Sequence, residues 1–394
     1  MGTGKAGWLR AQYELVFGQQ WPVTTGALLV AVTNVFLFAF DRPWTVSDGL
    51  RNWGDWLFRF LGIIARPDLL PPWLFSGSIL NLGLLAGALS AALLSREFAI
   101  RVGPAGELVK GGLGGALMGT GAVLAFGCNI GGFFSALSAL SLSGLAMMLG
   151  LGIGAYLGLR YLLWEAEQFP GLSTGRSWIW GTARSTGMGA QPALGTLLLV
   201  VLLALAFVYS AFGYTPQGGF LLFGVAFGVT FQRSRFCLVR AFREPFMTGA
   251  GEHARAAALA LTVSLLGFSI HKLTDLKDAS TWVFPGFWLG GLLGGILFGV
   301  GMVLAGGCGA GSLWRAGEGH VKLWLAVLGF SLSGPLVRQA LVRGDWLGHL
   351  GTAVFLPTVT GWAPALLLVI GVLVAWYLLV AWNEDSGKMV IVGR

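Results

Sequence analysis

Long apolar runs separated by short polar segments make up most of the chain. A helix needs about 20 apolar residues to cross a hydrocarbon core of about 30 Å. By this rule the sequence predicts spans over residues 22–40, 73–94, 145–164, 192–212, 254–271, 287–305, 321–341 and 362–382. Two shorter glycine-rich segments, 111–127 and 219–232, are candidates for broken or re-entrant helices. The pattern predicts an all-α polytopic membrane protein with about nine or ten transmembrane helices plus short broken ones.

An amphipathic segment follows the first predicted span. Its apolar residues recur at helical spacing and are Trp53, Trp56, Leu57, Phe60 and Ile64, with Arg51, Asp55 and Arg59 on the opposite face. This pattern is typical of a helix that lies at the membrane interface and buries its apolar face. We expect residues 1–72 to hold the first transmembrane helix and this interfacial helix.

Two stretches of the chain resemble each other. Residues 114–132 and 294–312 align without a gap and are identical at 11 of 19 positions. The alignment superimposes Gly127-Cys128 on Gly307-Cys308. The string Ser-Leu-Ser-Gly occurs at 141–144 and again at 331–334. The second copy lies ten residues later than this alignment would place it, which predicts a ten-residue insertion after the second cysteine.

These matches predict two repeats joined by a linker. We expect the first repeat over 73–164, a polar linker over 165–191, the second repeat over 192–345, and a C-terminal transmembrane helix and tail over 346–394. Counting crossings places the two Gly-Cys blocks at opposite membrane faces, which favours an inverted repeat. A weaker match, of 95–101 with 234–240, runs in the same direction in both halves and favours a parallel repeat.

Composition agrees with a lipid environment. Only 11% of the 394 residues are charged and 55% are hydrophobic, whereas soluble chains carry about 25% charged residues. The 63 glycines follow no period of three and lie inside apolar segments, where small residues let helices approach closely. A soluble protein and a collagen-like chain are both excluded.

The net charge of +8 lies in short loops. Such a distribution favours the positive-inside bias of membrane proteins over nucleic-acid binding. A cytoplasmic N-terminus would place the arginine-rich loops 95–110 and 233–255 in the cytoplasm. We expect a multi-pass protein of the inner (plasma) membrane that contacts lipid and no nucleic acid, with both termini cytoplasmic. No Walker A sequence occurs, so the chain has no recognisable ATPase.

The three cysteines carry the candidate chemistry. Cys128, Cys237 and Cys308 each end an apolar segment, and their spacing suits neither a zinc site nor a disulfide framework. Backbone N–H groups exposed where a helix breaks bind anions, and a thiol adds a soft donor. The alternative is that each cysteine is a small buried hydrophobe. We expect no metal, cofactor or catalytic residue; the expected supporting residues are Gly127, Asn129, Gly131, Gly307, Gly309 and Gly311.

Four ionisable residues near the cysteines are further candidates. Arg233 and Arg235 precede Cys237 and would either draw an anion toward the cytoplasmic mouth or anchor the loop. Glu318 and His320 follow Cys308 and would form either a proton relay or an ordinary salt-bridged loop.

Three blocks of sequence resemble the YeeE/YedE sulfur-transport family, especially its longer YedE branch. They are Gly127-Cys-Asn-Ile-Gly-Gly-Phe-Phe134, Gln232-Arg-Ser-Arg-Phe-Cys-Leu-Val-Arg-Ala-Phe-Arg-Glu244 and Ala305-Gly-Gly-Cys-Gly-Ala-Gly-Ser-Leu-Trp-Arg-Ala-Gly-Glu-Gly-His320. The resemblance covers about residues 70–385. It implies an hourglass-shaped core in which Cys128, Cys237 and Cys308 pass thiosulfate inward by transient S–H···S contacts.

Two points stay open within this resemblance. The longer branch is associated with selenium metabolism, which implies a selenium analogue as another possible substrate. Shorter members carry the cysteine of the Arg-Ser-x-Phe-Cys block in the first half, whereas Cys237 lies in the second, so the order of the cysteines along the path is open.

The sequence thus predicts a non-enzymatic uptake transporter for a small sulfur oxyanion such as thiosulfate, or for a selenium analogue. The alternative is a membrane sulfur-relay protein, in which a cysteine persulfide passes sulfur to a cytosolic sulfurtransferase of the TusA or rhodanese type.

Overall fold

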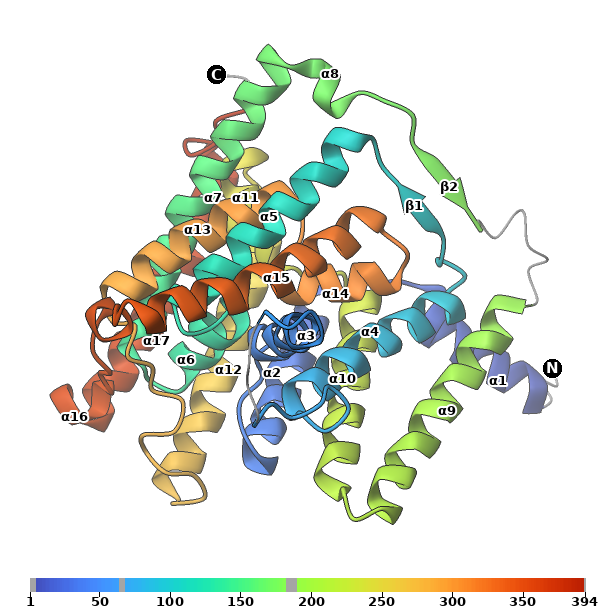
Figure 1. Cartoon of the computed structure of the whole chain (residues 1–394), viewed down its shortest axis with the longest axis horizontal. Helices are drawn as coiled ribbons and strands as arrows, with labels where there is room; N and C mark the ends of the chain where they lie inside the picture. Colours follow the sequence, from blue (N-terminus) through green and yellow to red (C-terminus); the bar gives the residue numbers. More distant parts are fainter. Residues whose placement is uncertain (1–4, 64–67, 182–189, 393–394) are drawn as a thin grey trace.

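Helices form nearly all the regular structure in residues 5–63, 68–181 and 190–392, the part of the chain that the computed structural model describes (Figure 1). Eight candidate spans there are long and apolar enough to cross a membrane, and the bent pair Ala105–Leu124 and Asn129–Ser138 would make a ninth. The long helices at these spans are α2 (Val23–Phe40), α4 (Ser76–Leu94), α7 (Leu142–Gln168), α9 (Ala190–Ala211), α12 (Glu252–Leu273), α13 (Leu289–Ala305), α15 (Val321–Arg343) and α17 (Trp362–Ser386). They match the predicted spans to within a few residues, which confirms the all-α polytopic fold.

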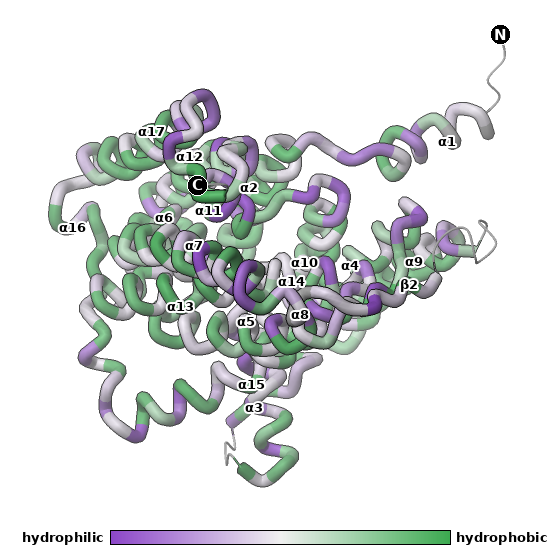
Figure 2. Tube along the Cα trace, turned by 90° about the horizontal axis from the view of Figure 1, so that it is seen from above, coloured by the Kyte–Doolittle hydropathy of each residue, from purple (hydrophilic) through white to green (hydrophobic). Residues whose placement is uncertain are grey.

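Two further helices of 20 residues, α5 and α10, and ten shorter helical elements complete the bundle in the described residues. They are α1 (Lys5–Tyr13), η1 (Glu14–Gly18), α3 (Ser47–Phe60), α5 (Ala105–Leu124), η2 (Asn129–Ser135), α6 (Ala136–Ser138), α8 (Pro170–Ser173), α10 (Thr215–Ser234), α11 (Leu238–Met247), α14 (Gly309–Gly317), η3 (Leu347–Leu350) and α16 (Leu356–Thr360). Figure 2 shows α1 projecting from the bundle, whose long helices are largely hydrophobic. Two strands, β1 (Ile100–Val102) and β2 (Trp178–Trp180), pair antiparallel and tie the predicted linker to the end of the α4–α5 loop. Residues 182–189 of that linker lie outside the description.

Glycines place the helix backbones in direct contact. A Cβ atom on Gly83 of α4 would lie 2.5 Å from the carbonyl oxygen of Leu221 on α10, and one on Gly224 would lie 2.9 Å from the Cα of Gly83. Gly150 of α7 and Gly295 of α13 meet in the same way. In lipid, association depends on such close packing, because burial of apolar surface adds little. The high glycine content therefore builds helix pairs.

The order of these contacts gives the helix directions. Gly83 and Gly87 of α4 face Gly224 and Val225 of α10 in the same order along both chains, so α4 and α10 are parallel. Gly114 of α5 faces Ala305 of α13, whereas Gly121, further along α5, faces the earlier residue Gly294. Helices α5 and α13 are therefore antiparallel and end at opposite ends of the bundle.

Helix α3 packs its glycine side against the bundle. A Cβ on Gly54 would overlap the carbonyl oxygen of Ser331, so this side lies directly on α15. Leu57 and Phe60, on the predicted apolar face, are 39% and 85% exposed on the protein surface, where a helix at the membrane interface contacts lipid. Asp55, on the predicted polar face, is 4% exposed, which the hydrophobic pattern did not indicate. The interfacial position of this helix stays a prediction. Ile64, the last residue of the predicted face, lies outside the described residues.

The predicted ten-residue insertion after the second cysteine is also wrong. Helix α7 begins at Leu142 and α15 at Val321, nearly the spacing that separates the two cysteines. The Ser-Leu-Ser-Gly string consequently lies at the start of α7 but in the middle of α15. Short strings of small residues recur by composition alone in a chain this rich in glycine, serine and leucine.

Candidate functional site

Each cysteine lies in a sharp break between two helices. The preceding helices end near Phe126, Arg235 and Gly306, whose φ angles of 59°, 57° and 76° are left-handed. Two positions further on, the cysteine immediately precedes the next helix: Cys128 precedes η2, Cys237 precedes α11 and Cys308 precedes α14. The first N–H groups of a helix have no partner within it, so each break presents a thiol beside unpaired donors. Such irregular backbone within a membrane protein is tolerated where it is buried or lines a cavity.

The three thiols converge in the interior. All three are free and buried. Cys237 and Cys128 both lie near enough to Cys308 to act on it electrostatically, and the Asn129 side chain lies within hydrogen-bonding reach of it. Its sulfur accepts a hydrogen bond from the N–H of Gly311 at 3.4 Å. The structure thus brings together three predicted path residues that lie far apart in the sequence.

Asn129 supplies polar atoms that the protein leaves unpaired. Its side chain is fully buried, and apart from the neighbouring Cys308 thiol neither Oδ1 nor Nδ2 has a hydrogen-bond partner in the described part of the chain. A buried amide without partners costs about 1–3 kcal/mol, so such groups are rare away from functional positions. The carboxamide beside Cys308 is therefore available to a ligand.

The predicted glycines are required by close packing at the breaks. A Cβ on Gly127 would lie 2.5 Å from the backbone nitrogen of Gly132, and one on Gly307 would lie 3.2 Å from the Ser312 hydroxyl. Gly131 lies against Thr45, and Gly309 lies against Val46. The glycines thus keep each thiol next to another chain segment.

That segment is a fourth break, over residues 41–46 between α2 and α3, which the sequence did not indicate as part of the site. The hydroxyl of Thr45 lies 3.8 Å from the Cys128 sulfur. Two asparagines stabilise the non-helical backbone of this break. Asn34 accepts from the Trp44 N–H at 2.8 Å, and Asn81 donates to the Val46 carbonyl at 2.9 Å. Asn34 also donates to the Ser135 hydroxyl on η2 at 3.2 Å. The position of both asparagines within apolar spans was the available sequence signal.

A cavity of about 580 Å³, here called the Cys237 cavity, opens at one end of the bundle. Cys237 lines it, together with Arg235, Arg240, Arg243, Arg315, Lys322 and Glu244, so cations predominate. The Cys237 N–H donates to Nδ1 of His253 on α12 at 3.3 Å, which fixes the thiol-bearing backbone. His253 carried no sequence signal, because a lone histidine near a helix start has no motif.

A second cavity, of about 240 Å³ and here called the Arg51 cavity, lies at the other end. Its lining includes Arg51, Thr45, Ser47, Phe126 and Trp282. Phe126 follows α5, whereas Gly306, which follows α13, lines the Cys237 cavity. Because α5 and α13 are antiparallel, the two cavities lie at opposite ends, with the thiols between them.

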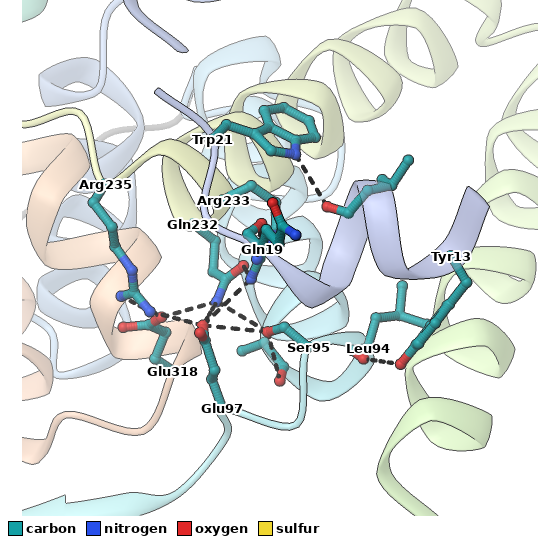
Figure 3. A network of polar contacts seen from close by, with 12 residues as sticks. Tyr13, Gln19, Trp21, Leu94, Ser95, Glu97, Gln232, Arg233, Arg235 and Glu318 are labelled. Atoms are coloured by element: carbon teal, nitrogen blue, oxygen red, sulfur yellow. Dashed lines mark hydrogen bonds and ion pairs between the residues drawn. The ribbon is translucent and has the colours of Figure 1, made fainter. Parts of the chain in front are cut away.

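The two predicted arginines belong to one ion-pair network (Figure 3). Arg235 donates to Glu97 at 2.8 Å and to Glu318 at 2.6 Å. Arg233 is 1% exposed, and its guanidinium lies 3.4 Å from Glu97. Gln232 donates to both carboxylates. Arg235 therefore lines the Cys237 cavity with its charge compensated, and Arg233 is an interior structural cation.

Glu318 and His320, the predicted relay pair, are neighbours. Nε2 of His320 lies 3.7 Å from Oε2 of Glu318, and His320 lines the Cys237 cavity. Burial, followed by the charges of Arg315 and Arg101, lowers the pKa of His320 to about 3. The imidazole is therefore neutral at physiological pH.

Known proteins resemble this chain over the regions that contain the three cysteine blocks. The profile of the family described as Sulphur transport matches residues 5–157 and 233–390. Probable transporter YedE of Escherichia coli is 27% identical over 321 residues, 78% of this chain and 79% of that protein. Thiosulfate transporter TsuA of Escherichia coli is 34% identical over 124 residues, 32% of this chain and 35% of that protein. Thiosulfate transporter TsuA of Spirochaeta thermophila is 33% identical over 131 residues, 33% of this chain and 39% of that protein. These relatives are named transporters, in agreement with a non-enzymatic chain.

Proposed function

Because this chain belongs to the sulphur transport family, we propose that it is an inner-membrane uptake transporter for thiosulfate or a closely similar sulfur oxyanion. The observation that carries the proposal is the convergence of three buried thiols between two cavities at opposite ends of a helix bundle. Neither the fold nor the family match would by itself indicate how an anion crosses the interior.

The thiols are suited to a desolvated sulfur anion. A thiol is a weak S–H donor and a polarisable acceptor, so it contacts a soft sulfur atom without the desolvation cost of a buried cation. The Asn129 amide would donate its N–H to an oxygen of the anion, which pairs its Nδ2. In this scheme the thiols stay reduced, and the anion passes from Cys128 by way of Cys308 to Cys237. A selenium analogue has the same charge and similar softness, and would follow the same path.

The charge distribution supports an orientation. Arginines and lysine concentrate around the Cys237 cavity, and the positive-inside bias favours the cytoplasm for that end. The Arg51 cavity would then face outward, with both termini cytoplasmic. An entering dianion is opposed by the membrane potential at about 2.3 kcal/mol per charge per 100 mV. Proton coupling through Glu318 and His320, or metabolic trapping, would have to offset this opposing free energy.

We also propose an inverted repeat that begins at α2 and not at residue 73. Helix α2 packs on α12 as α10 packs on α4, and α7 packs on α13 as α15 packs on α5. In each half a short helix, α3 or α11, follows a break after the first helix. By this relation the 41–46 break is the counterpart of the Cys237 break. The weaker match of 95–101 with 234–240 does not fit, because it pairs α4 with the parallel helix α10.

The test is uptake of labelled thiosulfate into proteoliposomes. We expect Cys128→Ser, Cys237→Ser and Cys308→Ser each to lower the rate at least tenfold, because a hydroxyl is a hard oxygen group in place of a soft sulfur. Wild-type rates in all three folded variants would contradict the thiol path, and no uptake by wild-type protein would contradict the function.

A persulfide relay is the second candidate, since Cys237 lines a cavity wide enough for an acceptor to approach. A Cys237 thiolate would attack the outer sulfur of thiosulfate; the S–S bond of the anion would break, and sulfite would leave with the electron pair. A cytosolic sulfurtransferase would take the sulfur atom. Intact-protein mass spectrometry distinguishes the two, because only the relay leaves one added sulfur on a cysteine.

A further inference from the structure

Arg51 is an uncompensated cation in the Arg51 cavity. Two arginines line this cavity, and one of them, Arg42, pairs with Asp48 at 2.7 Å and donates to the Ser76 hydroxyl at 3.0 Å. Arg51 has no ion pair or hydrogen bond with any residue that the structure describes. Its guanidinium therefore gives the cavity a net positive charge with all its donors available.

The fold holds this cation in place from behind. A Cβ on Gly334 of α15 would lie 3.8 Å from both Cβ and Cγ of Arg51, so the glycine leaves room for the arginine stem. Gly54, less than one turn further along α3, seats that helix directly on α15. Arg51 thus extends from a helix that is fixed against the core, and less side-chain entropy is lost when it binds a ligand.

The same cavity leads to the first thiol. Thr45 and Ser47 both line it, and their hydroxyls lie 3.1 Å apart. Thr45 Oγ1 lies 3.8 Å from the Cys128 sulfur, and the Cys128 N–H donates to Ser47 Oγ at 3.3 Å. An unpaired cation, two hydroxyls and a thiol therefore follow one another from the cavity into the interior.

We propose that Arg51 holds the oxygen end of the entering anion in this cavity and directs its terminal sulfur toward Cys128. The inference rests on the proposed function and adds an entry site to it. A guanidinium offers N–H donors in a planar fork that matches two oxygens of one anion, whereas the thiol beyond it favours the soft end. The cavity thus selects for charge and oxygen geometry, and Cys128 selects for sulfur. Sulfate, which has only oxygens, binds at Arg51 but proceeds no further.

The experiment measures the concentration dependence of labelled thiosulfate uptake into proteoliposomes, with and without sulfate. Arg51→Gln raises KM about tenfold with the maximal rate within twofold, as loss of a charge-assisted hydrogen bond predicts. Arg51→Lys keeps the charge and stays within about threefold of wild-type KM. Arg59→Gln is the matched control, because Arg59 is on the same helix but is exposed, over the ring of Trp56. Sulfate inhibits wild type competitively and loses this effect in Arg51→Gln.

An unchanged KM in Arg51→Gln, or wild-type uptake that sulfate does not inhibit, would overturn the entry site while leaving the transporter function intact. Absence of uptake by wild-type protein would instead contradict the proposed function. If Arg51→Gln does not fold, the sulfate competition in wild type and in Arg51→Lys decides the question.

Discussion

At the residue scale, the interior keeps a few polar atoms unsatisfied beside the thiols. Asn34 and Asn81 are equally buried and bind the 44–46 backbone, although Oδ1 of Asn81 has no partner in the described residues. The Asn129 amide has no partner there other than the neighbouring Cys308 thiol. This contrast separates asparagines that stabilise the fold from the one that is available to a ligand. Unpaired buried groups reduce stability, so their presence at the centre of the path is consistent with a use in transport.

Replacing Asn129 with leucine separates transport from stability. Asn129→Leu removes two unpaired buried atoms, so we expect the melting temperature to be unchanged or raised while thiosulfate uptake falls at least tenfold. Asn34→Leu is the control of equal size, and it should lose about 1–3 kcal/mol of stability because the Trp44 N–H loses its acceptor. Both readouts come from purified protein in detergent and from proteoliposomes. Normal uptake by Asn129→Leu would show that the amide does not contact the substrate.

His320 makes stability depend on pH. Its pKa of about 3 in the folded protein lies below its usual value of 6.5, so the unfolded chain gains a proton as pH falls below 6.5 while the folded protein does not. Wild type should therefore lose about 1–2 kcal/mol more stability than His320→Gln between pH 7.5 and pH 5. Thermal unfolding at the two pH values measures this difference, and equal losses in the two proteins would refute it.

At the element scale, the candidate site lies at helix ends, whereas stability depends on the packed faces of the helices. Each thiol immediately precedes a short helix after a left-handed residue, so its position depends on where the preceding helix stops. The faces of α4, α5, α7, α10 and α13 are fixed by glycine contacts that tolerate no side chain. These rigid helix pairs fix the positions of the three breaks relative to one another.

Two glycines in the long helices provide a matched test of this packing. Gly83→Val places carbons against the α10 backbone and should cost about 1–3 kcal/mol. Gly152→Val on α7 meets nothing within 4 Å and should change stability by less than about 0.5 kcal/mol. Unfolding of both variants in the same detergent gives the comparison. Equal destabilisation would mean that intrinsic helix propensity, and not contact between helices, is responsible.

At the scale of the whole molecule, antiparallel α5 and α13 place two similar sequence blocks toward opposite ends of the bundle. Each block ends in a cysteine, and the antiparallel arrangement points those ends at different cavities. The ion pairs of Arg235 with Glu97 and Glu318 join the α4 and α14 ends around the Cys237 cavity. Two cavities at opposite ends with thiols between them suit the proposed stepwise passage of an anion.

Thiol labelling from each side tests this arrangement. With Cys128 and Cys308 replaced by serine, Cys237 should react with a membrane-impermeant reagent only in inverted vesicles, because the proposed orientation turns its cavity toward the cytoplasm. A chain whose sole cysteine is Ser47→Cys should react only in right-side-out vesicles. Labelling of both positions from the same side would contradict cavities at opposite ends.

The sequence by itself determined the spans, the membrane class, the three cysteine blocks and the family resemblance. These properties depend on local hydrophobicity and on short motifs, which are readable along the chain. Only the tertiary structure decided that Gly54 places α3 directly on α15, that residues 41–46 border Cys128, and that Arg51 is unpaired among the described residues whereas Arg235 is compensated. The reason is physical: these features depend on which backbones approach closely and which distant carboxylates meet a given cation, and neither is encoded in the periodicity of a single segment.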